Sequence, residues 1–508
     1  MAQPPVPAVD DLETARALIA TLHEHVTTLQ REKASLQHQL DVLCRRLFGK
    51  KADRVDPRQL QLALEQLTNE PGPVTEPIEM DSGETPVLGH TRRRPTGRRP
   101  LPAHLPRRRV ELDIPDGEKQ CACGRMKDRI GETVSEKLEY EPARFAVVET
   151  VRAKYACADC HDGVVEAPAP PQAVEKSLAG EGLLAHVVVS KYVDHLPLHR
   201  LSGIFAREGI DLSRSTLCDW VADVATALMP IAEELRAQVV AASYVQTDDT
   251  TITVLGDDGG SYKGRLWTYL DPLGHQVVFD ATPTHERDCP ATFLATFSGK
   301  LQADAYAGYD GLYATGRVLE IGCMAHARRR FVDAFMTDPR AALIVALIQQ
   351  LYQIERSGAD LDVTGREALR QKESVPLLSK IDAARHELAA SVLPKSPLGD
   401  ALGYLNNQWA ALQRYVDDGR LSIDNNRCEN QLRVVAVGRR NWLFAGSFEG
   451  ARRAAVLYSL VQSCKLIHVP PFEYFKDVLL RVATHPQRLI RELTPKGWAT
   501  SCRRSAAA

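Results

Sequence analysis

The first periodic feature of the chain is an apolar repeat of seven residues near its start. Leucine occupies every seventh position from Leu22 to Leu43, and a companion apolar series from Ile19 to Leu47 is broken once by Lys33. Two such series form the narrow seam of a coiled coil, in which a single polar residue can fix register and partner number. We predict a self-associating coiled coil over residues 12–48, which would make the protein a homo-oligomer. The alternative is an amphipathic helix that packs on the chain's own core.

A second pattern, of separate short helices, covers residues 180–235. Apolar stripes predict helices over Leu183–Tyr192 and Leu198–Arg207, and Ser213 is suited to cap a third helix. The first turn of that helix, where a recognition helix meets base edges, contains Arg214, Ser215 and Thr216. These helices indicate a helix-turn-helix DNA-binding domain or, alternatively, a helical spacer.

Beyond residue 240 the apolar positions alternate in the way typical of strands. The expected elements are strands Ser243–Leu255, Arg265–Asp271 and His275–Asp280, helix Ala291–Phe297, and strand Lys300–Asp304. Three strands, a helix and a fourth strand begin a ribonuclease H-like α/β sheet. We assign this catalytic domain to residues 240–336 and 421–484. Helical patterns over Ala341–Leu351 and Leu377–Leu388 indicate a helical insertion at 337–420, and Leu457–Ile467 and Phe472–Val482 are expected as closing helices.

Charge is distributed unevenly along the chain, because the formal charge of −2 over 508 residues conceals two segments of opposite sign. The linker 49–110 is first acidic and Pro-rich and then Arg-rich. A dense run of arginine favours a polyanion such as DNA over a merely solvated basic linker. The arginines expected to contact DNA here are Arg92, Arg93, Arg94, Arg98 and Arg99. No apolar run reaches the ~18 residues that a membrane span needs, and the N-terminus lacks a secretory signal. We therefore expect a cytoplasmic, nucleoid-associated protein with no membrane partner.

The eleven cysteines are too sparse for a disulfide scaffold, but four of them form two close pairs. Four thiolates can hold a tetrahedral structural Zn²⁺, and the candidate ligands are Cys121, Cys123, Cys157 and Cys160. Arg144–Tyr155, between the pairs, alternates like a strand. We predict a zinc ribbon over residues 111–170, with a dithiol redox site as the alternative.

Carboxylates supply the candidate chemistry. In a ribonuclease H-like sheet, a carboxylate on the first strand and one just past the fourth lie side by side, as Asp248 and Asp304 would. Asp424 or Asn425 can cap a helix that carries Glu429 in its second turn. Three carboxylates could bind two Mg²⁺ ions roughly 4 Å apart. Arg433, one helical turn beyond Glu429, could meet a phosphate.

Several stretches resemble the insertion-sequence-66 family of bacterial DDE transposases, over nearly the whole chain. They are residues 194–199, Thr247–Thr251, Leu301–Tyr309, Cys323–Phe331, Asp424–Glu429 and Gly438–Ser447. The resemblance implies Mg²⁺-dependent cleavage and joining of DNA at Asp248, Asp304 and Glu429. It also implies binding of double-stranded DNA, as transposon ends and target, with help from small companion proteins of the same element.

The chain departs from the family at Asp249, where glutamate is usual, and at Asn430, where arginine is usual. The first departure leaves the choice between Asp248 and Asp249 open. Cys323 and His326 form a spacing seen in several DDE transposases, and we expect them to be structural rather than metal ligands.

Arg439, Arg440 and Trp442 suit contact with DNA or, alternatively, form a packed turn. The expected architecture is thus multidomain: an N-terminal coiled-coil helix, a zinc ribbon, a helix-turn-helix, and a ribonuclease H-like catalytic domain with a helical insertion. The rival functions are a non-catalytic DNA-binding regulator, a metal-dependent nuclease that does not join strands, and an inactive remnant of the element. A regulator has no need of Glu429.

Overall fold

The computed structural model describes residues 145–148, 154–156, 164–166, 170–175, 177–256 and 258–507. The predicted coiled coil, the acidic and Arg-rich linker and the four cysteines of the predicted zinc ribbon lie outside these residues. The chain divides into two compact units, of which the smaller spans Asn69–Ala169.

The described part of the smaller unit contains a β-hairpin. Strand β1 (Lys154–Ala156) pairs antiparallel with β2 (Val164–Glu166), and the connection at 157–163 contains both Cys157 and Cys160. Residues 145–148 belong to no strand. The strand predicted over Arg144–Tyr155 is therefore confirmed only at its end, and it is wrong at 145–148.

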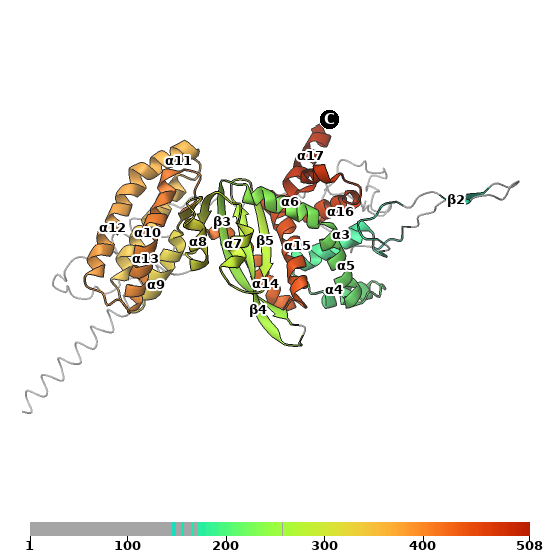
Figure 1. Cartoon of the computed structure of the whole chain (residues 1–508), viewed down its shortest axis with the longest axis horizontal. Helices are drawn as coiled ribbons and strands as arrows, with labels where there is room; N and C mark the ends of the chain where they lie inside the picture. Colours follow the sequence, from blue (N-terminus) through green and yellow to red (C-terminus); the bar gives the residue numbers. More distant parts are fainter. Residues whose placement is uncertain are drawn as a thin grey trace, which may run out of the picture. The chain divides into compact units, whose positions relative to one another are not determined.

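The larger unit is built on a five-stranded mixed sheet with the strand order β5-β4-β3-β6-β7 (Figure 1). Strands β3, β4 and β5 are antiparallel neighbours, and β6 and β7 run parallel to β3. The bounds are β3 Tyr244–Leu255, β4 Ser261–Asp271, β5 Gln276–Thr282, β6 Gly299–Gln302 and β7 Val318–Ile321, with helix α7 (Asp288–Phe293) between β5 and β6. The predicted order of three strands, a helix and a fourth strand is confirmed, and the mixed sheet is consistent with a ribonuclease H-like fold.

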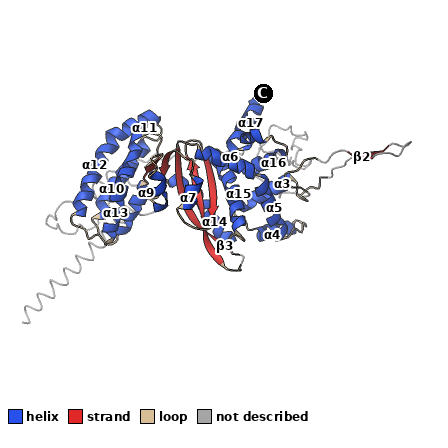
Figure 2. Cartoon of the chain, in the orientation of Figure 1, coloured by secondary structure: helices blue, strands red, loops and turns tan. Residues whose placement is uncertain are grey.

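One edge of the sheet is closed by helix α15 (Phe448–Leu466), which lies along β5 (Figure 2). The backbone N–H groups of Val277 and Phe279 donate to the hydroxyls of Ser463 and Ser459, at 3.0 and 2.8 Å. An uncovered edge strand exposes unpaired backbone groups that invite aggregation, and the two serines satisfy those groups here. Further helices share the apolar core on this side: α3 Glu181–Tyr192, α4 Leu198–Arg207, α5 Arg214–Ala227, α6 Met229–Val240, α16 Pro471–Arg481, the 3-10 helix Gln487–Leu493 and α17 Pro495–Ala507.

Between β7 and the last part of the chain lies a helical body with an apolar core of its own. Tyr244 and Ile321 of the sheet belong to the same core, so the body packs directly beside β3 and β7. Its helices are α9 Met324–Phe335, α10 Ala341–Ser357, α11 Val363–Leu369, the π-helical turn Arg370–Ser374, α12 Val375–Ala389, α13 Pro397–Gln413 and the 3-10 helix Arg414–Asp417. A short 3-10 helix (Ala307–Tyr309) and α8 (Asp310–Tyr313) connect β6 to β7.

The helices predicted for a helix-turn-helix are present. Ser213 caps α5 by accepting a hydrogen bond from the backbone N–H of Thr216 at 3.1 Å. The connection from α4 to α5 spans residues 208–213, longer than the 3–4 residues typical of the motif. Among the described helices, none combines the length and apolar character that a bilayer span requires.

Candidate active site

The first candidate carboxylates are neighbours on β3, Asp248 and Asp249. Successive side chains of a strand point to opposite faces of the sheet, so the two carboxylates enter different surroundings. The Asp249 carboxylate accepts from Arg265 Nη1 at 2.7 Å and lies 3.2 Å from His285 Nε2. None of the described cationic side chains pairs with Asp248, and it is Asp248 that interacts with the other candidate carboxylates.

Asp304 reaches Asp248 through the parallel pairing of β3 with β6. Gln246 is the register partner of Gln302, the last residue of β6. Asp304 comes two residues after the end of β6, as predicted, whereas Asp248 lies inside β3, two residues beyond the last pair with β6, and not at a strand end. The charge of Asp304 acts on Asp248, and the side-by-side arrangement of the two carboxylates stays a prediction.

Glu429 comes from helix α14 (Asn426–Trp442), whose start is tied to β3. Asn425 precedes the helix, and its side chain donates to the Thr247 carbonyl at 3.3 Å and accepts from Cys323 Sγ at 3.0 Å. Asp424 Oδ1 accepts from the backbone N–H of Asn426 at 3.1 Å. The helix therefore begins beside the residue that precedes Asp248. Glu429 lies in its first turn, so the prediction of a second-turn position is wrong by one turn.

The three carboxylates affect one another electrostatically. The pKa of Asp248 is raised to about 7, mainly by burial and further by the negative charges of Asp304 and Glu429, and a backbone hydrogen bond from Asp249 opposes this shift. Like charges in a shared, poorly solvated site disfavour ionisation. A shift of this kind marks a candidate functional site.

Two basic residues of α9 flank Glu429. Its Oε1 atom is buried without a hydrogen-bond partner and lies 3.4 Å from His326 Nε2, while Oε2 lies 3.5 Å from Arg329 Nη2. Burial lowers the pKa of His326 despite the opposing effects of Glu429 and Asp304. Cys323 is buried and hydrogen-bonded to Asn425, as expected for a structural cysteine. The sequence pattern gave no sign of this position of Arg329, because only the folded contact between α9 and Glu429 produces it.

The chemistry of this donor set suits a hard cation. Carboxylate oxygens are the ligands that Mg²⁺ prefers, and Glu429 Oε1 accepts no hydrogen bond from the described residues, although His326 Nε2 lies 3.4 Å away. Within the described residues, no three His, Cys, Asp or Glu side chains are close enough to hold a single metal ion. A pair of ions about 3.5–4 Å apart needs more room between carboxylates than one ion does.

The predicted DNA-contacting residues of α5 and α14 fall into two groups. Arg214, Ser215, Arg433 and Arg440 are exposed. Arg439 instead donates to Thr250 Oγ1 and to the Thr251 carbonyl, at 2.9 and 2.7 Å, and so ties α14 to β3.

Thr216 and Trp442, also predicted to contact DNA, make contacts within the protein. The Thr216 hydroxyl lies 2.9 Å from that of Ser213 within the cap of α5. Trp442 is half-buried and packs against the apolar core, so this residue fits the packed-turn alternative better than it fits contact with a base.

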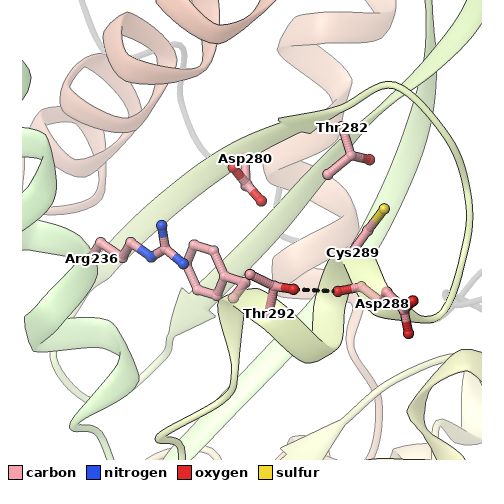
Figure 3. Close-up of a pocket in the computed structure, with 7 residues that line it drawn as sticks. Arg236, Asp280, Thr282, Asp288, Cys289 and Thr292 are labelled. Atoms are coloured by element: carbon pink, nitrogen blue, oxygen red, sulfur yellow. Dashed lines mark hydrogen bonds between the residues drawn. The ribbon is translucent and has the colours of Figure 1, made fainter.

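A separate pocket of about 350 Å³ lies between α6, β5 and α7 (Figure 3). Its lining includes Asp280, and the Arg236 guanidinium stacks 4.4 Å from the ring centroid of Phe293. Asp280 pairs with Trp267, which pairs with Asp249, so the pocket is on the sheet face opposite Asp248. None of the three candidate carboxylates lines it.

Comparison with known protein families decides the identity of the chain. The model described as "Transposase IS66 family", a DDE domain, matches residues 176–453. The chain belongs to this family. In this IS66 family member, residues 118–161 match "zinc-finger binding domain of transposase IS66", 35–110 match "Transposase C of IS166 homeodomain", a leucine-zipper domain, and 459–495 match "IS66 C-terminal element". A DDE transposase domain implies a phosphoryl-transfer enzyme that uses divalent metal and binds DNA, and the zinc-finger domain suggests zinc.

Similar proteins occur in Sinorhizobium fredii, and they match this chain over most of its length. The uncharacterized protein y4hP is 35% identical over 494 residues, covering 91% of this chain and 88% of the relative. The uncharacterized protein y4jD is 32% identical over 501 residues, covering 94% and 97%, and y4qI is 32% identical over 493 residues, covering 93% and 90%. No solved structure matches the chain.

Proposed function

We propose that this protein is a DNA transposase that binds the two ends of an insertion sequence and catalyses metal-dependent strand cleavage and strand transfer. Asp248, Asp304 and Glu429 are the proposed catalytic residues, and Asp248 rather than Asp249 is the first carboxylate. The observation that carries the proposal is that two segments distant in sequence meet β3 beside Asp248: β6, which ends two residues before Asp304, pairs with β3 up to Gln246, and Asn425 at the start of α14 donates to the Thr247 carbonyl. The charges of Asp304 and Glu429 act on Asp248 in agreement with this arrangement.

The three carboxylates would hold Mg²⁺, which when bound supplies Lewis-acid activation of an attacking oxygen and charge stabilisation of a leaving oxygen. The chain's own residues orient the DNA. Arg329, beside Glu429, and the exposed Arg433 one turn along α14 are suited to bind the phosphates on either side of the reacting one. Burial lowers the pKa of His326, which favours its neutral form beside Glu429.

The remaining assignments belong to the same proposal. Zn²⁺ would be held by Cys121, Cys123, Cys157 and Cys160, and the Arg-rich segment with the helices at 180–235 would bind the transposon ends. The coiled coil at 12–48 would join two or more copies, so that two ends can be paired. The domain boundaries given above, including the insertion at 337–420, are part of this proposal.

The test compares wild type with Asp304→Ala on duplexes that carry the ends flanking the gene, in Mg²⁺. Asp304→Ala is expected to bind the ends as wild type does and to lose both cleavage and joining. Cleavage by purified Asp304→Ala would refute the catalytic assignment. Wild-type cleavage without joining to target DNA would indicate a nuclease, and end binding without cleavage in any divalent metal would indicate a regulator.

A further inference from the structure

The turn that carries Asp304 has an unusual backbone. Ala305, the next residue, has a φ of 68°, in the left-handed region that non-glycine residues seldom adopt. This conformation lets the backbone N–H of Tyr306 donate to Asp304 Oδ1 at 3.2 Å. The orientation of the Asp304 carboxylate therefore depends on the contacts that hold the Tyr306 side chain in place.

Tyr306 is held by the loop that follows β5. Its hydroxyl donates to the His285 carbonyl, and its ring stacks on the His285 ring with centroids 4.3 Å apart and planes 23° apart. Gly308 leaves room for the tyrosine ring, because a Cβ at this position would lie 2.1 Å from Tyr306 Cε1. Glycine is thus required two residues beyond the tyrosine.

His285 is in turn fixed by the sheet face opposite Asp248. Its Nε2 lies 3.2 Å from Asp249 Oδ1, and its ring stacks on Trp267 with centroids 5.3 Å apart. Trp267 is fully buried and is the register partner of Asp249. The Asp249 carboxylate is itself anchored by Arg265.

These contacts form one continuous connection from Asp249 to Asp304. We propose that Asp249, His285 and Tyr306 are positioning residues that hold the Asp304 carboxylate in its metal-binding orientation. This inference rests on the proposed function, since it takes Asp304 to be a metal ligand. Asp249 thus has a role distinct from that of Asp248. Asp248 binds the cation, whereas Asp249, on the opposite face of β3, orients the Asp304 carboxylate.

The sharpest test is Tyr306→Phe, which removes the hydroxyl and keeps the stacked ring. Loss of a group that orients a metal ligand typically weakens metal binding by 10–100-fold, so we expect Mn²⁺ affinity, measured by calorimetry without DNA, to fall by about tenfold. The Mg²⁺ concentration for half-maximal cleavage should rise in parallel, while end binding stays unchanged. Tyr262→Phe, at a partly exposed tyrosine near the start of β4, is the matched control and should leave both quantities unchanged.

A second pair of variants tests the other end of the connection. Asp249→Ala should weaken Mn²⁺ binding as Tyr306→Phe does, and Asp249→Glu, which keeps the charge, should restore most of it. Hydrogen exchange at the Tyr306 amide should become faster in Asp249→Ala and not in Asp249→Glu.

The outcomes separate this inference from the proposed function. Unchanged Mn²⁺ affinity and unchanged amide exchange in both Tyr306→Phe and Asp249→Ala would overturn the positioning role, even if wild type cleaves DNA. Active Asp304→Ala would refute the proposed function instead, whatever the amide exchange shows.

Discussion

The two faces of strand β3 place neighbouring aspartates in opposite electrostatic surroundings. On one face Asp248 is buried near two other carboxylates, which raises its pKa to about 7. On the other face Asp249 is paired with Arg265 and His285. Burial of a carboxylate costs stability, and a cation beside it offsets part or all of that cost. Under the proposed function, the first face receives positive charge from a bound metal ion, whereas the Asp249 carboxylate on the second face is already paired with Arg265.

The largest expected difference between the faces is in catalysis. Asp248→Asn should reduce single-turnover cleavage below detection, because it removes a proposed ligand of the reacting centre. Asp249→Asn should reduce it by only about tenfold, since it acts through Asp304. Equal losses in the two variants would erase the distinction between ligand and positioning residue.

The second difference is in stability without metal, and its sign is opposite for the two residues. At pH 8, where Asp248 is largely ionised, Asp248→Asn removes a buried like charge and should raise the free energy of unfolding by about 1–2 kcal/mol, as substitutions that relieve active-site strain can do. Asp249→Asn leaves Arg265 with a weaker partner and should lower it by about 1–2 kcal/mol. Urea unfolding in EDTA would measure both, and a destabilising Asp248→Asn would contradict the electrostatic account.

The third difference is in the pH dependence of stability. Because the folded-state pKa of Asp248 lies above its unfolded value, the folded protein binds more protons between about pH 4 and 7. Metal-free stability should therefore fall as pH rises through this window, by at most about 1.4 kcal/mol per pH unit from this group.

Matched variants isolate the contribution of Asp248. Unfolding curves at several pH values should show a flatter dependence in Asp248→Asn than in wild type, and Asp249→Asn should keep most of the wild-type slope. The same slope in Asp248→Asn and wild type would show that other groups cause the dependence.

The smallest expected effect on stability is that of Ala305→Gly, at the residue between Asp304 and Tyr306 in the contact series that begins at Asp249. Ala305→Gly relieves the left-handed strain but increases the entropy of the unfolded chain, and the two effects, each about 1 kcal/mol, should nearly cancel. Ala305→Val should lower the melting temperature clearly, because a β-branched residue tolerates a positive φ poorly. A melting temperature in Ala305→Val equal to that of wild type would argue against strain at this position.

Much of the fold follows from local patterns in the sequence. Alternation and turn residues predicted the order of β3, β4, β5, α7 and β6, and Ser213 marked the start of α5. Helix α15 begins well before the predicted Leu457, because Ser447 caps it by accepting from the backbone N–H of Gly450. The charged Arg452 and Arg453 interrupt the apolar run and conceal that start.

The site was less accessible to the sequence, because its geometry depends on long-range packing. Because side chains alternate along a strand, Asp248 and Asp249 are predicted on opposite faces of the sheet. The alternation does not predict which of these faces α14 covers. Arg370 shows the same limit: it lies in a polar stretch, yet its side chain is 1% exposed. Its guanidinium binds Glu355 and the carbonyls of Tyr415, Asp418 and Leu421. It thereby fixes the segment that leads into α14, and no local pattern signals this role.

The proposed metal site can be tested most directly by diffraction from crystals of the protein soaked in Mn²⁺, with the metal located by its anomalous signal. We expect Mn²⁺ to be bound among the carboxylates of Asp248, Asp304 and Glu429, with Asp249 still paired to Arg265 on the other face. Metal bound elsewhere, with Glu429 remote from both aspartates, would contradict it.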